Sequence, residues 1–250
     1  MKTFAMLLLA SAVAVPAAFG QGNGQLQSAV QKQLKGSQFK NVQVSTQGND
    51  VSLTGTVNSY ADKLQAEKKV HRVHGVAAIN DQIQVAGPTI PDAQLQSKVI
   101  DRVTNGLLEA NVPVQFQTVM IGVHNGVVYV GGHVAGPIAA NGAMSAIDDT
   151  PGVKGVVDQL KVDPVSPMDT QLRMAVYRAV YSSPFLTYYA MNPSKPVRIQ
   201  VENGHVELYG VVDSEGAKNA AGIKANSVPG VFSVKNNIVV AGQKNEKPAQ

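Results

Sequence analysis

The sequence predicts an α+β protein made of three tandem modules, and two observations lead to this prediction. An 11-residue segment that begins with Gly-Val recurs three times along the chain, at residues 75–85, 152–162 and 230–240. Each Gly-Val pair also follows another glycine by 20 residues, which gives the pairs Gly55/Gly75, Gly132/Gly152 and Gly210/Gly230. Self-similarity at a fixed period is typical of duplicated structural units.

Each copy contains the pattern of a β-hairpin. Apolar and polar side chains alternate in two neighbouring segments, at 41–46 and 51–57, at 119–123 and 128–134, and at 197–201 and 206–212. The residues between them are Gly48-Asn49, Asn125-Gly126 and Asn203-Gly204. Alternation with period two predicts a strand with one buried face, and Asn and Gly tolerate the positive φ of tight turns. The repeated Gly-Val segment predicts a third strand in each module.

Two helices are predicted in each module, one before the hairpin and one between the paired glycines. The second helix has one apolar face, formed by Ala66, Val70 and Val73, by Ala143, Ile147 and Thr150, and by Ala221, Ala225 and Val228. The first helix begins near Gln25, Gln94 and Gln171, with Asn23, Asp92 and Asp169 as expected N-caps. We therefore expect small α-β-β-α-β sandwich modules, each a mixed three-stranded sheet packed on two helices.

Short segments with proline separate the modules, which we place at 22–86, 92–163 and 168–241. Residues 242–250 are polar and predict a disordered tail. The modules are small, so contact between them is expected to add stability. Residues 1–20 carry Lys2, an apolar run, and Ala18 and Gly20 at a cleavage spacing, which predicts a signal peptide.

The amino-acid composition excludes several classes of protein. The chain has no cysteine, which excludes disulfides, thiolate chemistry and a lipoprotein anchor after the signal. No later segment approaches the roughly 20 apolar residues of a transmembrane helix. The expected location is periplasmic or secreted. The formal charge of +4 is mild, and we expect no nucleic-acid partner.

Taken together, the hairpin strand that ends in glycine, the helix, the Gly-Val pair and the final alternating strand resemble the BON domain, named for bacterial osmotically inducible and nodulation proteins. The motif residues are Gly55, Gly75, Val76, Gly132, Gly152, Val153, Gly210, Gly230 and Val231. The resemblance implies an envelope location and non-catalytic attachment to phospholipid surfaces or envelope proteins. Copies two and three depart from it by about eight inserted residues before the hairpin.

No residue pattern indicates an enzyme or a cofactor site. The sequence contains no GxSxG, phosphate-loop, dinucleotide or HExxH motif. His71 and His74 lie three residues apart, but no Asp or Glu completes a metal site at an obvious spacing. The histidines His124, His133 and His205 stand singly in or beside strands. We therefore expect no catalytic residue, no metal and no cofactor.

Two surfaces are candidates for binding. The second helix of module 1 carries Lys63, Lys68, Lys69 and Arg72, and an inward apolar face turns the last three outward together. Such a stripe suits an anionic bilayer, and the alternative is an ordinary solvated helix face.

The second candidate is the insert at 181–196, which gathers Phe185, Leu186, Tyr188, Tyr189 and Met191. It suits a bilayer interface or a protein partner, and the alternative is that it extends the first helix and covers a sheet. For the shorter insert at 105–118, packing is the default.

The leading functional hypothesis is peripheral attachment to anionic phospholipid in the cell envelope. The alternative is a protein-interaction scaffold, in which edge strands or apolar inserts bind an envelope protein or a second copy of the chain. Salt separates the two hypotheses, because attachment to headgroups weakens as ionic strength rises.

Overall fold

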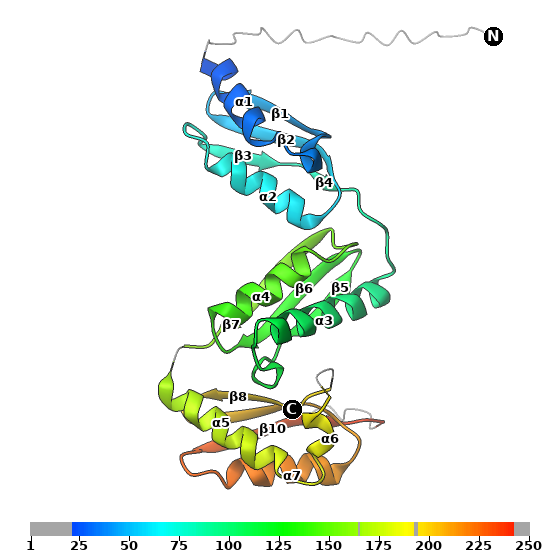
Figure 1. The fold of residues 1–250 in the computed structure, drawn as a ribbon, viewed down its shortest axis with the longest axis vertical. Helices are drawn as coiled ribbons and strands as arrows, with labels where there is room; N and C mark the ends of the chain where they lie inside the picture. The colour runs from blue at the N-terminus through cyan, green and yellow to red at the C-terminus, as the bar shows by residue number, and fades with distance from the viewer. Residues whose placement is uncertain (1–21, 165, 193–194, 243–250) are drawn as a thin grey trace, which may run out of the picture.

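The computed structural model describes residues 22–164, 166–192 and 195–242, which form three modules that follow one another along the chain (Figure 1). Each module has the predicted α-β-β-α-β order and the predicted mixed sheet. The predicted fold class is therefore confirmed. The predicted signal peptide at 1–20 and residues 243–250 of the predicted tail lie outside the described residues.

The modules share one set of elements. Module 1 contains α1 (Gly22–Gln33), η1 (Ser37–Phe39), β1 (Val42–Gln47), β2 (Asp50–Val57), α2 (Tyr60–His71), β3 (Ala78–Asp81) and β4 (Gln84–Val85). Module 2 contains α3 (Asp92–Glu109), η2 (Val114–Phe116), β5 (Met120–His124), β6 (Val127–Val134), α4 (Pro137–Asp148) and β7 (Gly155–Val162). Module 3 contains α5 (Pro167–Tyr181), α6 (Thr187–Ala190), β8 (Arg198–Glu202), β9 (His205–Val212), α7 (Glu215–Asn226) and β10 (Ser233–Val240).

The second hairpin strand is central in every sheet. Strands β2, β6 and β9 pair antiparallel with the strand before them and parallel with the strand that follows the second helix. In module 1 the last strand is interrupted, so β3 and β4 pair separately with β2. At the interruption the Ile83 side chain is buried, and its amide donates to Asp81 Oδ1 (2.8 Å).

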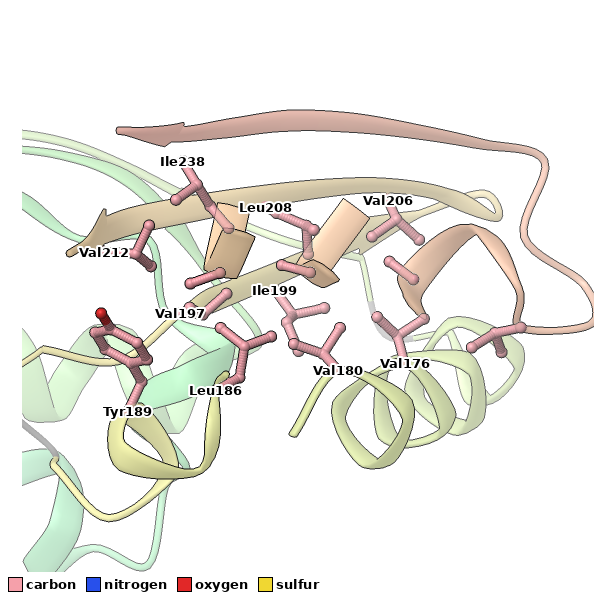
Figure 2. Close-up of a cluster of buried hydrophobic side chains, with 14 of the residues drawn as sticks. Val176, Val180, Leu186, Tyr189, Val197, Ile199, Val206, Leu208, Val212 and Ile238 are labelled. Atoms are coloured by element: carbon pink, nitrogen blue, oxygen red, sulfur yellow. The ribbon is translucent and has the colours of Figure 1, made fainter. Parts of the chain in front are cut away.

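The core of each module lies between the sheet and its helices. Figure 2 shows this core in module 3, where Val176 and Val180 of α5 lie beneath Ile199 and Leu208 of the sheet. The predicted second-helix face is also buried, and its alanines Ala66, Ala143 and Ala221 are fully inaccessible to solvent. A methyl group at these positions lets helix and sheet approach closely, as the repeated alanine predicts.

The first motif glycine is required by a backbone contact. Gly55 and Gly132 have φ values of +102° and +96°, and a Cβ on them would collide with the carbonyl oxygens of Asn41 and Thr118. Because only glycine combines a positive φ with such an approach, these residues serve the fold rather than a ligand.

The N-cap prediction was wrong for Asn23, Asp92 and Asp169. Asn23 lies inside α1, which begins at Gly22. The N-cap of α3 is Pro91, and that of α5 is Ser166. Asp92 instead accepts hydrogen bonds from the turn amides of Asn125 (2.8 Å) and Gly126 (3.0 Å), and these bonds lower the pKa of its carboxyl group. In module 3, Asp169 binds the amides of Asn203 and Gly204 in the same way, at 3.0 Å each. Each carboxylate therefore ties its helix to the hairpin turn.

The insert of module 2 lengthens α3 and then crosses to module 3. Leu107 and Val114 are buried in the module 2 core, as the packing interpretation expects. Phe116 packs against the module 3 core, with its ring 5.9 Å from that of Tyr177 in an edge-to-face arrangement. The insert therefore provides part of the predicted contact between modules.

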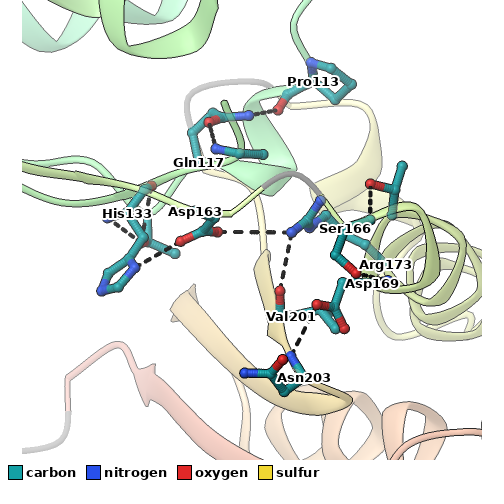
Figure 3. A network of polar contacts seen from close by, with 12 residues as sticks. Pro113, Gln117, His133, Asp163, Ser166, Asp169, Arg173, Val201 and Asn203 are labelled. Carbon is teal, nitrogen blue, oxygen red and sulfur yellow. Dashed lines mark hydrogen bonds and ion pairs between the residues drawn. The ribbon is translucent and has the colours of Figure 1, made fainter. Parts of the chain in front are cut away.

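A polar network also joins modules 2 and 3 (Figure 3). Asp163 is buried between His133 (Nδ1 to Oδ1, 2.9 Å) and Arg173 (3.8 Å). Arg173 also donates to the Val201 carbonyl (3.1 Å), and its guanidinium lies 5.9 Å from the centre of the Phe116 ring. A carboxylate from the end of module 2 thus contacts a cation from the first helix of module 3, beside an aromatic contact.

Candidate functional site

Helix α2 positions the cationic stripe, defined here as Lys68, Lys69 and Arg72. Ser59 caps the helix by accepting a hydrogen bond from the Asp62 amide (3.1 Å). Burial of Ala66 and Val70 then fixes the rotation of the helix, so that Lys68 and Arg72 are exposed and Lys69 is half-buried. The outward direction predicted from the helical period agrees with this arrangement.

Lys63 does not share this surface. Its Nζ donates to the Ile83 carbonyl (2.7 Å) and lies 3.7 Å from Asp81, so it holds the interruption between β3 and β4. The expectation that Lys63 belongs to the cationic surface is therefore corrected, because its ammonium group is engaged within module 1. Sequence periodicity could not show this contact, which joins residues 20 apart.

The stripe faces module 2 across a groove. Helix α2 contributes Lys68, Lys69 and Arg72 to one wall, and the C-terminal part of α4 contributes Ser145, Asp148 and Asp149 to the other. The cavity between the walls measures about 390 Å³. Within the described part of the chain, no ion pair within 4.0 Å joins the two walls. Cationic and anionic side chains thus share one open groove without direct pairing.

Asp148 is the least favourably placed charge in this groove. Burial raises the pKa of its carboxyl group to about 6, and the positive charge of Lys68 opposes that rise. Its Oδ1 atom is buried and has no hydrogen-bond partner among the described residues. The folded protein therefore disfavours the ionised form of Asp148, which the nearby stripe compensates only in part.

The insert of module 3 divides into a buried and an exposed part. Leu186 and Tyr189 are buried in the core, and the Tyr189 hydroxyl donates to Asp213 Oδ2 (3.0 Å). These two residues are thus removed from the predicted interface, because they cover their own sheet. Phe185, Tyr188 and Met191 stay 62%, 56% and 82% exposed around α6. We call these three residues the apolar rim.

The three histidines in or beside strands, His124, His133 and His205, each contact a polar side chain of their own module. Within 22–164, 166–192 and 195–242, no group of three or more metal-ligating side chains is close enough to hold an ion. His133 is engaged by Asp163, and the His205 ring nitrogen Nδ1 lies 2.8 Å from the Ser233 hydroxyl. Over the same residues, no helix has the length and apolarity to cross a membrane.

The fold defines a class of protein: tandem α-β-β-α-β modules with charged and apolar residues on their surfaces. The chain belongs to the BON domain family, whose model matches residues 23–87, 91–164 and 169–242. The resemblance seen in the three glycine motifs is therefore confirmed. Membership of this family points to a non-catalytic, envelope-associated role in contact with phospholipid or with other proteins.

Two solved structures are similar to this chain at low sequence identity. The chain is similar to the C-terminal domain of CdsD, the structural protein of the type III secretion system of Chlamydia trachomatis, with 16% identity and a TM-score of 0.24 over 88% of this chain and 97% of that one. A second structure of CdsD from the same organism gives 16% identity and a TM-score of 0.23 over 86% and 92% of the two chains. No curated protein matches the sequence.

Proposed function

We propose that this protein attaches peripherally to anionic phospholipid surfaces of the cell envelope through the cationic stripe. The observation that carries the proposal is the convergence of Lys68, Lys69 and Arg72 on one helix face beside an open groove. Near an anionic bilayer each cationic side chain contributes about 1 kcal/mol. Three of them give about 3 kcal/mol, which corresponds to reversible and salt-sensitive attachment.

The apolar rim is a second contact in this proposal. Phe185, Tyr188 and Met191 project from the insert of module 3, and Tyr188 keeps its hydroxyl in contact with the Asn192 amide (3.2 Å). Aromatic side chains with one polar end suit the interface between headgroups and acyl chains. The rim therefore supplies an apolar contribution that salt does not weaken.

A protein-interaction role is the second candidate, and the sheet of module 2 favours it. Met120 and Tyr129 point to the face of this sheet away from its helices, with exposed fractions of 64% and 46%. Val157 is paired with Tyr129 on the next strand and is 37% exposed. Gly122 and Gly131 flatten the surface between them. An apolar sheet face of this kind suits a partner protein.

The test is co-sedimentation of the protein with vesicles of phosphatidylglycerol and phosphatidylcholine, or of phosphatidylcholine alone, at low and high salt. We expect binding only to the anionic vesicles, with loss of at least tenfold in affinity in the variant Lys68→Glu, Lys69→Glu, Arg72→Glu. The matched control changes three exposed lysines elsewhere, Lys98, Lys161 and Lys224, to glutamate. Its loss of binding free energy should be less than half of the loss in the stripe variant.

Equal losses in the two triple variants would mean that net charge alone drives binding, and the site assignment would fail. No binding to either vesicle would refute the lipid proposal and favour the scaffold. In that case Met120→Asp together with Tyr129→Asp should abolish partner binding.

A further inference from the structure

Two arginines lie at the junction of modules 2 and 3, and their surroundings differ. Arg173 has the carboxylate of Asp163 at 3.8 Å, the Val201 carbonyl at 3.1 Å and the Phe116 ring beside it. Arg198, the first residue of β8, has no carboxylate within 4.0 Å in the described chain. Among the described residues, its one hydrogen bond runs from Nη1 to the Val119 carbonyl, at 3.5 Å. The Nε atoms of both arginines are buried without a partner in the described chain, so the difference lies in the carboxylate.

An arginine cannot relieve this situation by losing its proton. Burial lowers the pKa of Arg198, but the guanidinium group keeps its charge at every physiological pH. Buried charges in proteins are normally paired and hydrogen-bonded, because an unpaired ion in a poorly solvated place is costly. The charge of Arg198 therefore calls for an anion that the described chain does not supply.

Arg198 borders a cavity with mainly apolar walls. The cavity measures about 90 Å³. Helix α3 contributes Ile100, Val103, Thr104 and Leu107, and the segment that follows contributes Val114, Gln117, Val119 and Ile121. Gln117 is already satisfied, since it donates to the Pro113 carbonyl (3.2 Å) and accepts from the Ala135 amide (2.9 Å). Arg198 thus provides the charge of an otherwise apolar site.

The size and opening of the cavity limit the ligand. A volume of about 90 Å³ corresponds to about three water molecules of liquid, or to a carboxylate with its first few methylenes. Ile100 lies at the mouth and is 37% exposed, so a longer chain would continue over its side chain to solvent. A bulky ligand would not fit this volume, and a polyanionic ligand would leave part of its charge unpaired among apolar residues.

We propose that the cavity between α3 and Arg198 binds the carboxylate end of a free fatty acid. The carboxylate accepts hydrogen bonds from the terminal nitrogens of the Arg198 guanidinium, since Arg198 lines the cavity. The first methylenes replace solvent against Val103, Leu107 and Val114. The site is separate from the cationic stripe, because it joins modules 2 and 3 rather than modules 1 and 2.

The test is equilibrium dialysis of the full chain, after delipidation, with octanoate. Octanol has the same chain without the charge, and acetate has the charge without the chain. We expect octanoate to bind at least about tenfold more tightly than either, because both the guanidinium and the apolar walls contribute. Equal binding of acetate would indicate a simple anion site, and equal binding of octanol an apolar cavity, and either result would overturn the proposal.

Variants locate the site. Arg198→Gln removes the charge and should weaken octanoate binding about tenfold, whereas Arg102→Gln removes an exposed charge from α3 and should change it less than twofold. Ile100→Glu keeps Arg198 and places a like charge at the mouth, so it should also weaken binding. Far-UV circular dichroism shows whether Arg198→Gln is folded. If it is not, octanoate binding to Ile100→Glu is the result that tests the proposal. No octanoate binding to the wild type, or full binding to the deciding variant, would contradict the proposal.

Discussion

The two junctions between modules are built differently. At the junction of modules 2 and 3, the buried Asp163 and Arg173 lie 3.8 Å apart and Phe116 packs on Tyr177. At the junction of modules 1 and 2, Tyr60 and the linker residue Ile90 pack against the module 2 core, and the groove between α2 and α4 stays open. No ion pair within 4.0 Å crosses this first junction among the described residues.

The second junction therefore stabilises the contact between two modules, whereas the first junction leaves charged side chains accessible. The buried charges of Asp163 and Arg173 at the second junction neutralise one another, so this pair holds two modules in register. Charges at the first junction border an open groove and remain available to a partner. The proposed lipid-binding stripe therefore belongs to the junction with fewer polar contacts between modules.

The largest expected effect comes from breaking the second junction at Arg173. Arg173→Ala leaves Asp163 buried beside His133 alone and removes the hydrogen bond to Val201. Loss of one partner of a buried ion pair should lower the free energy of unfolding by about 3 kcal/mol. Urea denaturation measures it, and Arg178→Ala, on the exposed face of the same helix, should cost less than about 0.5 kcal/mol. Similar costs for the two variants would contradict the role given to Arg173.

A second substitution compares the apolar contacts of the two junctions. Phe116→Ala removes a half-buried ring and its edge-to-face contact with Tyr177, and should cost about 2 kcal/mol. Tyr60→Ala removes a half-buried ring from the first junction, where Tyr60 has no ring–ring contact among the described residues. Its loss of unfolding free energy should therefore be smaller. Thermal unfolding of both variants under the same conditions checks the order. A larger loss for Tyr60→Ala would reverse the comparison.

A smaller effect is expected from the pH dependence of the first junction. The carboxyl pKa of Asp148 is raised from 3.8 to about 6 by burial, so folding favours its protonated form. The wild type should therefore lose stability as the pH rises from about 4 to 6, and Asp148→Asn should not. Because Asp148 is half exposed, solvent screening limits the difference at pH 7 to about 1 kcal/mol. Unfolding curves of both proteins at pH 4 and 7 test this prediction. The same difference in unfolding free energy between wild type and variant at the two pH values would refute it.

The smallest effect concerns vesicle binding. Asp149→Asn removes an exposed carboxylate from the wall opposite the stripe, without touching a core residue. The stripe should then attract anionic vesicles about twofold more strongly at low salt, and equally at high salt. Asp158→Asn, on strand β7, is the matched control. Weaker binding after Asp149→Asn would show that the two walls do not oppose one another in lipid attachment.

Much of the fold follows from local patterns in the sequence. The period-two segments, the turns of Asn and Gly and the apolar helix face are local signals, and each hairpin strand and second helix occurs where they predict it. The third strand of module 1 is the exception, because it is divided into β3 and β4. Gly55 and Gly132 were recognisable as markers, but the carbonyl groups that exclude a Cβ at these positions belong to distant residues. The assignment of Asp92 and Asp169 as N-caps failed for the same reason, because their true partners lie 33 to 35 residues away.

The candidate site was less predictable, because it depends on contacts between elements. Periodicity placed Lys68, Lys69 and Arg72 on one face, yet it carried no information about Asp148 on the opposite wall. The concentration of apolar residues in the insert grouped Leu186 and Tyr189 with their exposed neighbours. A short irregular insert has no period from which burial can be predicted. The position of Arg198, which has no carboxylate within 4.0 Å among the described residues, has no local sequence signal at all.

The central claim is that α2 is the surface that meets the membrane, and a fluorescent probe tests it most directly. The chain has no native cysteine, so an environment-sensitive dye can be attached at His71→Cys, beside the stripe, or at Asn226→Cys in module 3. Asn226 lies at the opposite end of α7 from Gly216, the residue next to Phe185 of the apolar rim. With phosphatidylglycerol vesicles at low salt, the dye at position 71 should shift to the blue and the dye at 226 should not. A shift at 226 alone, or at neither position, would contradict the account.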